Sequence, residues 1–205
     1  MPGCACHIEA KNAAERKTLL KLLLINGVMF VVGVAGGIMA DSTALVADSL
    51  DMLADASVYA LSLFAVGKAA QHKHRAAMLS GLFQIALAGM VVVDVIRRFV
   101  GGSVPESGWM MAIALLALLA NSYGLYLLSK HRKDGVHMRA SWIFTQNDVI
   151  ANLSVIVAGG LVVLLNSRLP DLIAGFAIAS LVIWGGVSIL QEARREKAAR
   201  GHGSA

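Results

Sequence analysis

Three aspartates lie close together in residues 44–57, whose sequence is ALVADSLDMLADAS and whose flanks are strongly apolar. Asp48, Asp51 and Asp55 are spaced by three and four residues, so a helix carries all three on one face. Each carboxylate would cost several kcal/mol against lipid, so we expect them to face a bundle interior or a water-filled cavity. Neighbouring negative charges away from solvent require bound protons or a bound metal ion. A site that alternates between the two is a cation–proton exchanger.

A second polar group interrupts another apolar stretch, where TQNDVIAN occupies residues 145–152. Asp148 and Asn152 are four residues apart and share a helical face, and Asn147 lies beside Asp148. Carboxylate and amide oxygens are suitable ligands for a divalent cation, although composition alone does not name the metal. For the aspartates of residues 44–57 the alternative is that they only hydrogen-bond neighbouring helices, and for Asp48 both interpretations stay open.

The composition is that of an integral membrane protein. Hydrophobic residues make up 57% of the 205 residues and charged residues only 15%, whereas a soluble domain carries about 25% charged residues. Because a membrane span needs about 20 predominantly apolar residues, we predict an all-α, polytopic membrane protein with six transmembrane helices. The predicted spans are residues 19–40, 43–67, 77–100, 108–129, 142–166 and 169–191.

The basic residues predict how these spans are oriented. Apart from Arg97, Arg98 and Arg168, the Lys and Arg residues lie at the start of span 1, between spans 2 and 3, between spans 4 and 5, or after span 6. Basic residues accumulate in cytoplasmic loops, so we expect both termini to be cytoplasmic. We attribute the net charge of +5 to these loops rather than to nucleic-acid binding.

These residues resemble motifs of the cation diffusion facilitator, or cation efflux, family. ALVADSLDMLADAS is similar to the family's second helix, whose metal-ligand pair falls on Asp51 and Asp55, with Asp48 as the preceding aspartate. The resemblance extends over about residues 17–193 and implies export of divalent transition metals, chiefly zinc, in exchange for protons, usually by a homodimer. Similar stretches follow in the family's order: KHRAAMLSGLFQ (73–84), VIRRF (95–99), NDVIANLSVIVAGGLV (147–162) and PDLIAGFAIASLVI (170–183).

Two features depart from the family pattern. On the family's fifth helix a second ligand pair is expected, where Asp148 matches the second ligand but Phe144 stands at the first. A phenyl ring cannot coordinate a metal, so Asn147, Asn152, Asp48 or water must supply the fourth ligand. Because the given sequence stops after its predicted membrane part, we also expect a short member that lacks the cytoplasmic domain through which many members dimerise and sense metal. Dimerisation is then expected through the transmembrane helices.

The segments outside the spans carry further potential metal ligands. Cys4, Cys6 and His7 could capture a soft cation such as Zn²⁺, Cd²⁺ or Cu⁺, or belong to a disordered tail with incidental cysteines. His72 and His74 could bind metal or protons at the cytoplasmic mouth, or belong to a solvated basic loop. The predicted domains are an N-terminal cytoplasmic tail (1–18), a six-helix cation-efflux transmembrane domain (19–193) and a short basic cytoplasmic tail (194–205).

We therefore expect a divalent metal efflux transporter that works by metal/proton antiport and alternating access in a bacterial inner membrane. Zn²⁺ is the favoured substrate, and Cd²⁺, Co²⁺, Ni²⁺, Fe²⁺ and Mn²⁺ are the other candidates, which the sequence does not rank. The metal is the cargo; we expect no required cofactor, enzymatic activity or nucleic-acid partner, only the lipid bilayer and a second copy of the chain. Two alternatives stay open: a membrane protein that binds or senses metal without transport, and a proton-coupled exporter of organic cations.

Overall fold

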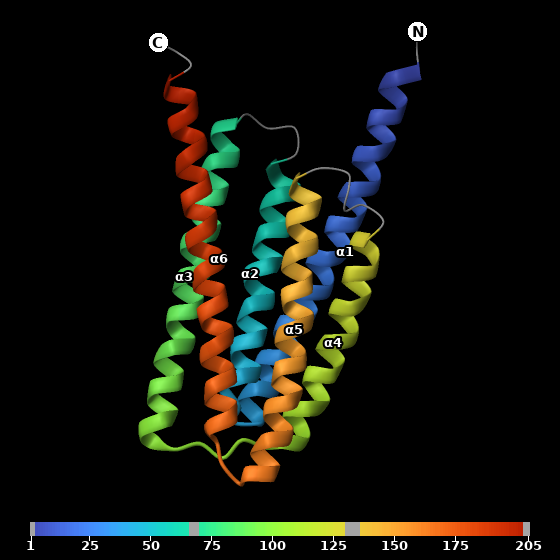
Figure 1. Ribbon diagram of the computed structural model, residues 1–205. Coiled ribbons are helices and arrows are strands. Elements are labelled where there is room, and N and C mark those ends of the chain that lie inside the picture. Colours follow the sequence, from blue (N-terminus) through green and yellow to red (C-terminus); the bar gives the residue numbers. More distant parts are fainter. Residues whose placement is uncertain (1–2, 66–69, 130–135, 203–205) are drawn as a thin grey trace.

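The computed structural model describes residues 3–65, 70–129 and 136–202, with side chains described mainly for 16–60, 78–129 and 145–191. The described residues form six helices that run roughly along one axis in an elongated bundle (Figure 1). These helices are α1 (Gly3–Met39), α2 (Thr43–Ala65), α3 (Ala70–Gly101), α4 (Ser107–Ser129), α5 (Val136–Leu165) and α6 (Leu169–His202). The all-α prediction is confirmed.

In the described part of the chain, five helices are long and apolar enough to cross a membrane. They agree with five of the predicted spans within a few residues. The sixth helix, α2, is not one of these five. Its three aspartates all lie within a segment as long as a membrane span, which makes that segment less apolar than the other five. The five apolar segments are Arg16–Met39, Met78–Gly101, Ser107–Ser129, Thr145–Leu165 and Leu169–Gln191.

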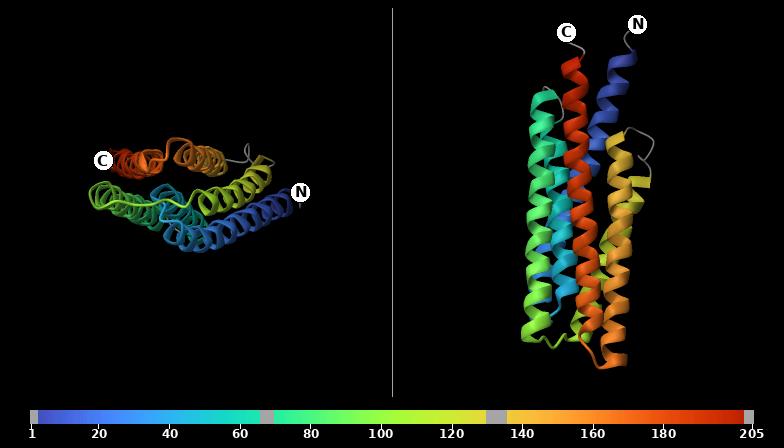
Figure 2. Two further views of the ribbon diagram at one scale, coloured as in Figure 1. Left: turned by 90° about the horizontal axis from the view of Figure 1, so that it is seen from below. Right: turned by 60° about the vertical axis from the view of Figure 1, so that its left-hand side comes forward.

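Helix α2 is the centre of the bundle and contacts all five other helices. Seen along the helices, α5 and α6 lie next to each other on one side of α2 (Figure 2). The most extensive contacts between helices are those of α1 with α2, α3 with α6, and α4 with α5. Because protein surrounds α2, this helix can carry carboxylates that a lipid-facing helix could not. Its buried residues Ala44, Leu45, Ala47 and Ala54 belong to the main hydrophobic core.

The N-terminus of α2 is capped from two directions. Ser42 Oγ accepts a hydrogen bond from the Leu45 amide at 3.1 Å, as an N-cap residue does. The carboxylate of Asp171, near the start of α6, accepts from the amides of Thr43 (2.8 Å) and Ala44 (3.1 Å) and from Ser42 Oγ (2.5 Å). The first amides of a helix lack partners within it, so a residue of α6 completes the beginning of α2.

Arg98, near the end of α3, holds the turn between α1 and α2. Its Nε donates to Asp94 Oδ2 at 2.7 Å, and its Nη1 donates to the Asp41 carbonyl oxygen at 2.6 Å and forms an ion pair with the Asp41 carboxylate. Asp41 has a left-handed backbone with a φ of 49° and also accepts from the Val104 amide at 2.8 Å. These contacts join the turn between α1 and α2, the end of α3 and the connection before α4 at one end of the bundle.

The opposite end of the bundle carries the beginning of α1 and the end of α6 (Figure 1). Both termini therefore lie on one side, as an even number of crossings requires. The backbone of 3–18 continues α1 as helix, and that of 192–202 continues α6. Two statements stay predictions: that this end faces the cytoplasm, and that the membrane domain spans residues 19–193.

Candidate metal-binding site

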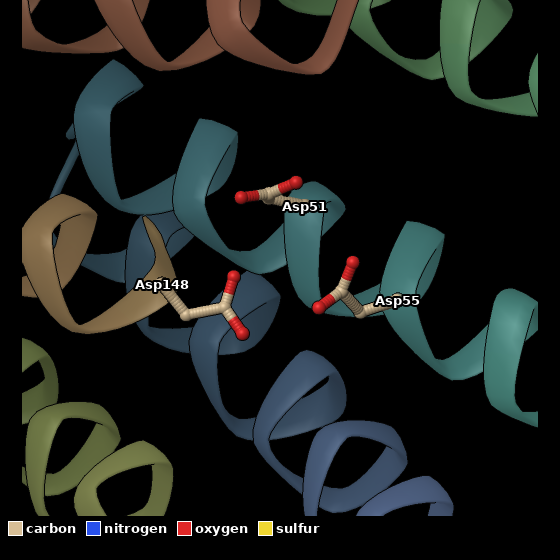
Figure 3. A group of neighbouring side chains, drawn as sticks. All are labelled: Asp51, Asp55 and Asp148. Carbon is tan, nitrogen blue, oxygen red and sulfur yellow. The ribbon is translucent and has the colours of Figure 1, made fainter. Parts of the chain in front are cut away.

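Three carboxylates from two helices converge inside the bundle. Asp51 and Asp55 come from α2 and Asp148 from α5, and Figure 3 shows their side chains gathered in the space between these helices. One oxygen from each lies within 4.8 Å of the others. Oxygen ligands on opposite sides of a divalent cation are about 4–5 Å apart, so one ion can contact all three.

The carboxylates of Asp55 and Asp148 are buried, but not all of their oxygens accept a hydrogen bond from the part of the chain that the structure describes. Their residues are only 4% and 3% exposed, and Oδ2 of each has no hydrogen-bond partner among the described residues. The two side chains are within hydrogen-bonding reach of each other. Two carboxylates in contact repel unless a proton or a cation lies between them, and an unpaired buried oxygen is costly. The pair is suited to hold either a proton or a metal.

A cavity of about 40 Å³ adjoins the three carboxylates. Besides them, its polar lining includes Asn147 of α5 and Gln84 of α3, and α6 contributes Trp184 and Gly185. This volume has room for a cation with a small number of water molecules. The polar groups other than the Trp184 indole are carboxylates and amides, which are oxygen donors.

Asp48 and Asn152 are bound to each other. Asn152 Nδ2 donates to both carboxylate oxygens of Asp48, at 2.7 and 2.8 Å, and Asn152 Oδ1 accepts from Asn121 Nδ2 at 3.0 Å. All three residues are fully or almost fully buried. The Asn152 amide is thus occupied at both ends by protein, whereas Asn147 lines the cavity beside the three converging carboxylates.

Sequence reasoning missed three residues around the site. Tyr59 is fully buried, lies within hydrogen-bonding reach of Asp55, and has its hydroxyl 3.0 Å from Oγ1 of Thr145. Helical spacing was an available signal, because Tyr59 follows Asp55 by four residues and Thr145 precedes Asp148 by three. Gln84 stands alone in an apolar run and has no such pattern around it.

The predicted metal-capture residues and the position of the missing family ligand lie outside the described side chains. They are Cys4, Cys6, His7, His72, His74 and Phe144. Their roles stay predictions.

The sequence comparisons agree with the motifs. Residues 19–196 match the cation efflux transmembrane domain. The zinc transporter ZitB of Pectobacterium atrosepticum is 26% identical over 93% of this chain and 62% of its own length. The Escherichia coli ZitB is 26% identical over 93% of this chain and 64% of its own length. A cadmium, cobalt and zinc/H⁺-K⁺ antiporter of Bacillus subtilis is 22% identical over 91% of this chain and 64% of its own length.

The chain therefore spans a little under two thirds of the length of these curated relatives. The matched residues reach into all six helices and include the segments that carry the converging aspartates. The predicted family resemblance and the predicted multi-pass integral membrane character are both confirmed. The chain belongs to the cation efflux family of transmembrane domains.

Proposed function

We propose that this chain is a transporter that exports divalent transition-metal cations from the cytoplasm in exchange for protons. The observation that carries the proposal is the meeting of Asp51, Asp55 and Asp148, with one oxygen from each within 4.8 Å, inside a membrane bundle. Ionisable side chains in the interior of a membrane-spanning bundle mark the pathways of ions. The printed names of the relatives, a zinc transporter and a cadmium, cobalt and zinc antiporter, support a divalent metal as the cargo.

The same carboxylates serve both partners of the exchange. A metal arriving from the cytoplasm binds the deprotonated oxygens and displaces their protons. When the bundle opens to the other side, protons from that side compete for the oxygens and lower the affinity for the metal. The metal thus favours the deprotonated site, and protons favour the metal-free site. Exchange follows when the helices alternate between two arrangements that open the site to opposite sides of the membrane.

Zn²⁺ is the cargo that the relatives' names favour, with Cd²⁺ and Co²⁺ next. Asn147 or water would complete the coordination of three carboxylates, because Asn147 lines the same cavity. We place the transporter in a bacterial inner membrane, with both termini in the cytoplasm on the positive-inside rule. We also propose a homodimer formed through transmembrane helices, for which the family resemblance is the support.

Flux through proteoliposomes tests this function directly. Purified protein would be reconstituted with a pH indicator inside, and a Zn²⁺, Cd²⁺ or Co²⁺ gradient imposed. We expect metal-driven proton movement in the wild type and its loss in Asp55→Asn and Asp148→Asn. Glu106→Gln is the matched control, because Glu106 is an exposed carboxylate in the connection before α4. Full exchange in Asp148→Asn would falsify the site assignment.

Two further outcomes of the same experiment identify the alternatives. Tight metal binding without any flux would indicate a metal-binding or sensing protein. Proton movement that is independent of metal, and that organic cations drive, would indicate an exporter of organic cations.

A further inference from the structure

Helix α3 brings one buried polar side chain to the metal cavity. Gln84 is only 4% exposed and lines the cavity together with Asp51, Asp55 and Asp148. Around it, α3 contributes apolar residues such as Leu87 to the hydrophobic core. A buried amide in a membrane helix is costly unless it is bonded, so its presence indicates a binding function.

The Gln84 amide is available to a ligand. No hydrogen bond joins it to another residue in the described part of the chain. Its oxygen lies beside α6, since a Cβ placed at Gly185 would be 3.6 Å from Gln84 Oε1, and Gly185 also lines the cavity. The amide oxygen therefore lies next to Gly185, which lines the same cavity as the three carboxylates.

Close packing of α3 against α6 fixes where this amide lies. A Cβ at Gly186 would be 2.9 Å from the Gly81 carbonyl oxygen and 3.3 Å from Gln84 Cβ. Only residues without a side chain allow two helix backbones to approach so closely. This close approach fixes the position of the Gln84 backbone and Cβ beside α6.

We propose that Gln84 donates its amide oxygen to the cation held by Asp51, Asp55 and Asp148, and that it thereby favours cations that accept more than four oxygen ligands. The inference rests on the proposed function and shifts the favoured cargo from Zn²⁺ toward Mn²⁺ and Co²⁺. Zn²⁺ prefers four ligands that include nitrogen or sulfur. Carboxylate, carbonyl and water ligands suit Mn²⁺, and Co²⁺ adapts to them. A bound cation would also link the α3–α6 pair to α2 and α5.

The test measures the binding of metals alone to the purified full chain in detergent. Gln84→Met keeps the volume but removes the oxygen, and Gln84→Glu keeps an oxygen donor. Gln146→Ala is the matched control, because Gln146 is an exposed amide on α5. We expect Gln84→Met to weaken Mn²⁺ and Co²⁺ binding about tenfold, and Zn²⁺ binding less. Gln84→Glu should bind all three metals at least as tightly as the wild type.

The visible absorption of bound Co²⁺ reports the coordination number independently of affinity. It should intensify in Gln84→Met, as expected when a ligand is lost from a higher-coordinate site. Wild-type affinity and an unchanged Co²⁺ spectrum in Gln84→Met would overturn the proposal, as would equal weakening by Gln84→Glu. Asp148→Asn separates the two hypotheses. If Asp148→Asn abolishes binding while Gln84→Met binds metals like the wild type, only the role of Gln84 is wrong; if Asp148→Asn binds normally, the carboxylate site itself is wrong.

Discussion

The side-chain amide of Asn152 joins α5 to α2 by donating to both carboxylate oxygens of Asp48, at 2.7 and 2.8 Å. Asp48 lies three residues before Asp51, and Asn152 lies four residues after Asp148. Because α2 and α5 run in opposite directions, this pair lies about one helical turn from the converging carboxylates, on the side away from the termini (Figure 1). It therefore fixes the axial register that lets the aspartates of two helices meet.

Exchanging the two side chains tests this pairing. Asn152→Asp alone places two carboxylates face to face, and we expect it to lower the free energy of unfolding by about 1–3 kcal/mol. Adding Asp48→Asn restores one donor and one acceptor and should recover most of the loss. Denaturant unfolding in detergent measures the cycle, with Ser154→Ala on the exposed face of α5 as control. If the two single effects simply add, the residues do not act as a pair.

Asp171 offers a second test, because its carboxylate completes the beginning of a different helix. Asp171→Ala leaves the amides of Thr43 and Ala44 without their acceptor, and we expect a loss of about 1–2 kcal/mol in the free energy of unfolding. Asp171→Asn keeps one oxygen and should lose less. Thermal unfolding compares these variants with Glu106→Ala, which removes an exposed carboxylate from the connection before α4, at the same end of the bundle. Equal unfolding temperatures for Asp171→Ala and Glu106→Ala would contradict the capping role.

The approach of α3 to α6 predicts that two glycines respond differently to one added methyl group. At Gly186 that group would lie 2.9 Å from a backbone oxygen of α3, so the helices must separate, at a cost of about 1–3 kcal/mol. At Gly89 it would meet nothing within 4 Å, and alanine is the better helix former. We expect Gly186→Ala to unfold at a lower temperature and Gly89→Ala to match or exceed the wild type. The reverse order would show that the close approach is not important for stability.

Much of the fold follows from local sequence rules. The lengths of the apolar stretches define the helices, since a span needs about 20 apolar residues. The three- and four-residue spacing of Asp48, Asp51 and Asp55 indicates one helical face, and the cost of charge in lipid places that face inside. The structure shows this interior placement directly for the nearly inaccessible Asp48 and Asp55.

The partners of these side chains depend on helix packing, which spacing does not specify. The four-residue spacing places Asn152 on the same helical face as Asp148. Its hydrogen bonds to Asp48 and Asn121 depend on how α2, α4 and α5 are aligned along their axes, which spacing does not specify. Asp171 follows Pro170 at the start of α6, a position typical of a residue that caps its own helix. It instead binds the first amides of α2, because the connections of the two helices meet at that end of the bundle.

The carboxylate site also predicts how metal affinity depends on pH. Metal binds the deprotonated oxygens of Asp51, Asp55 and Asp148, so each proton that the site releases makes binding compete with that proton. As the pH falls, the dissociation constant should therefore rise by roughly tenfold per pH unit for every proton released. Above the pH at which the site is already deprotonated, the affinity should become independent of pH.

Calorimetric titration of Zn²⁺ in buffers of different ionisation enthalpy counts these protons. We expect the wild type to release at least one proton per metal near neutral pH, and Asp148→Asn to release fewer because it lacks one titratable ligand. Glu106→Gln should release as many as the wild type, since its carboxylate is exposed and outside the cavity lining. Binding that releases no protons and does not change with pH would mean that metal and protons do not share these oxygens, and exchange at this site would then have no physical basis.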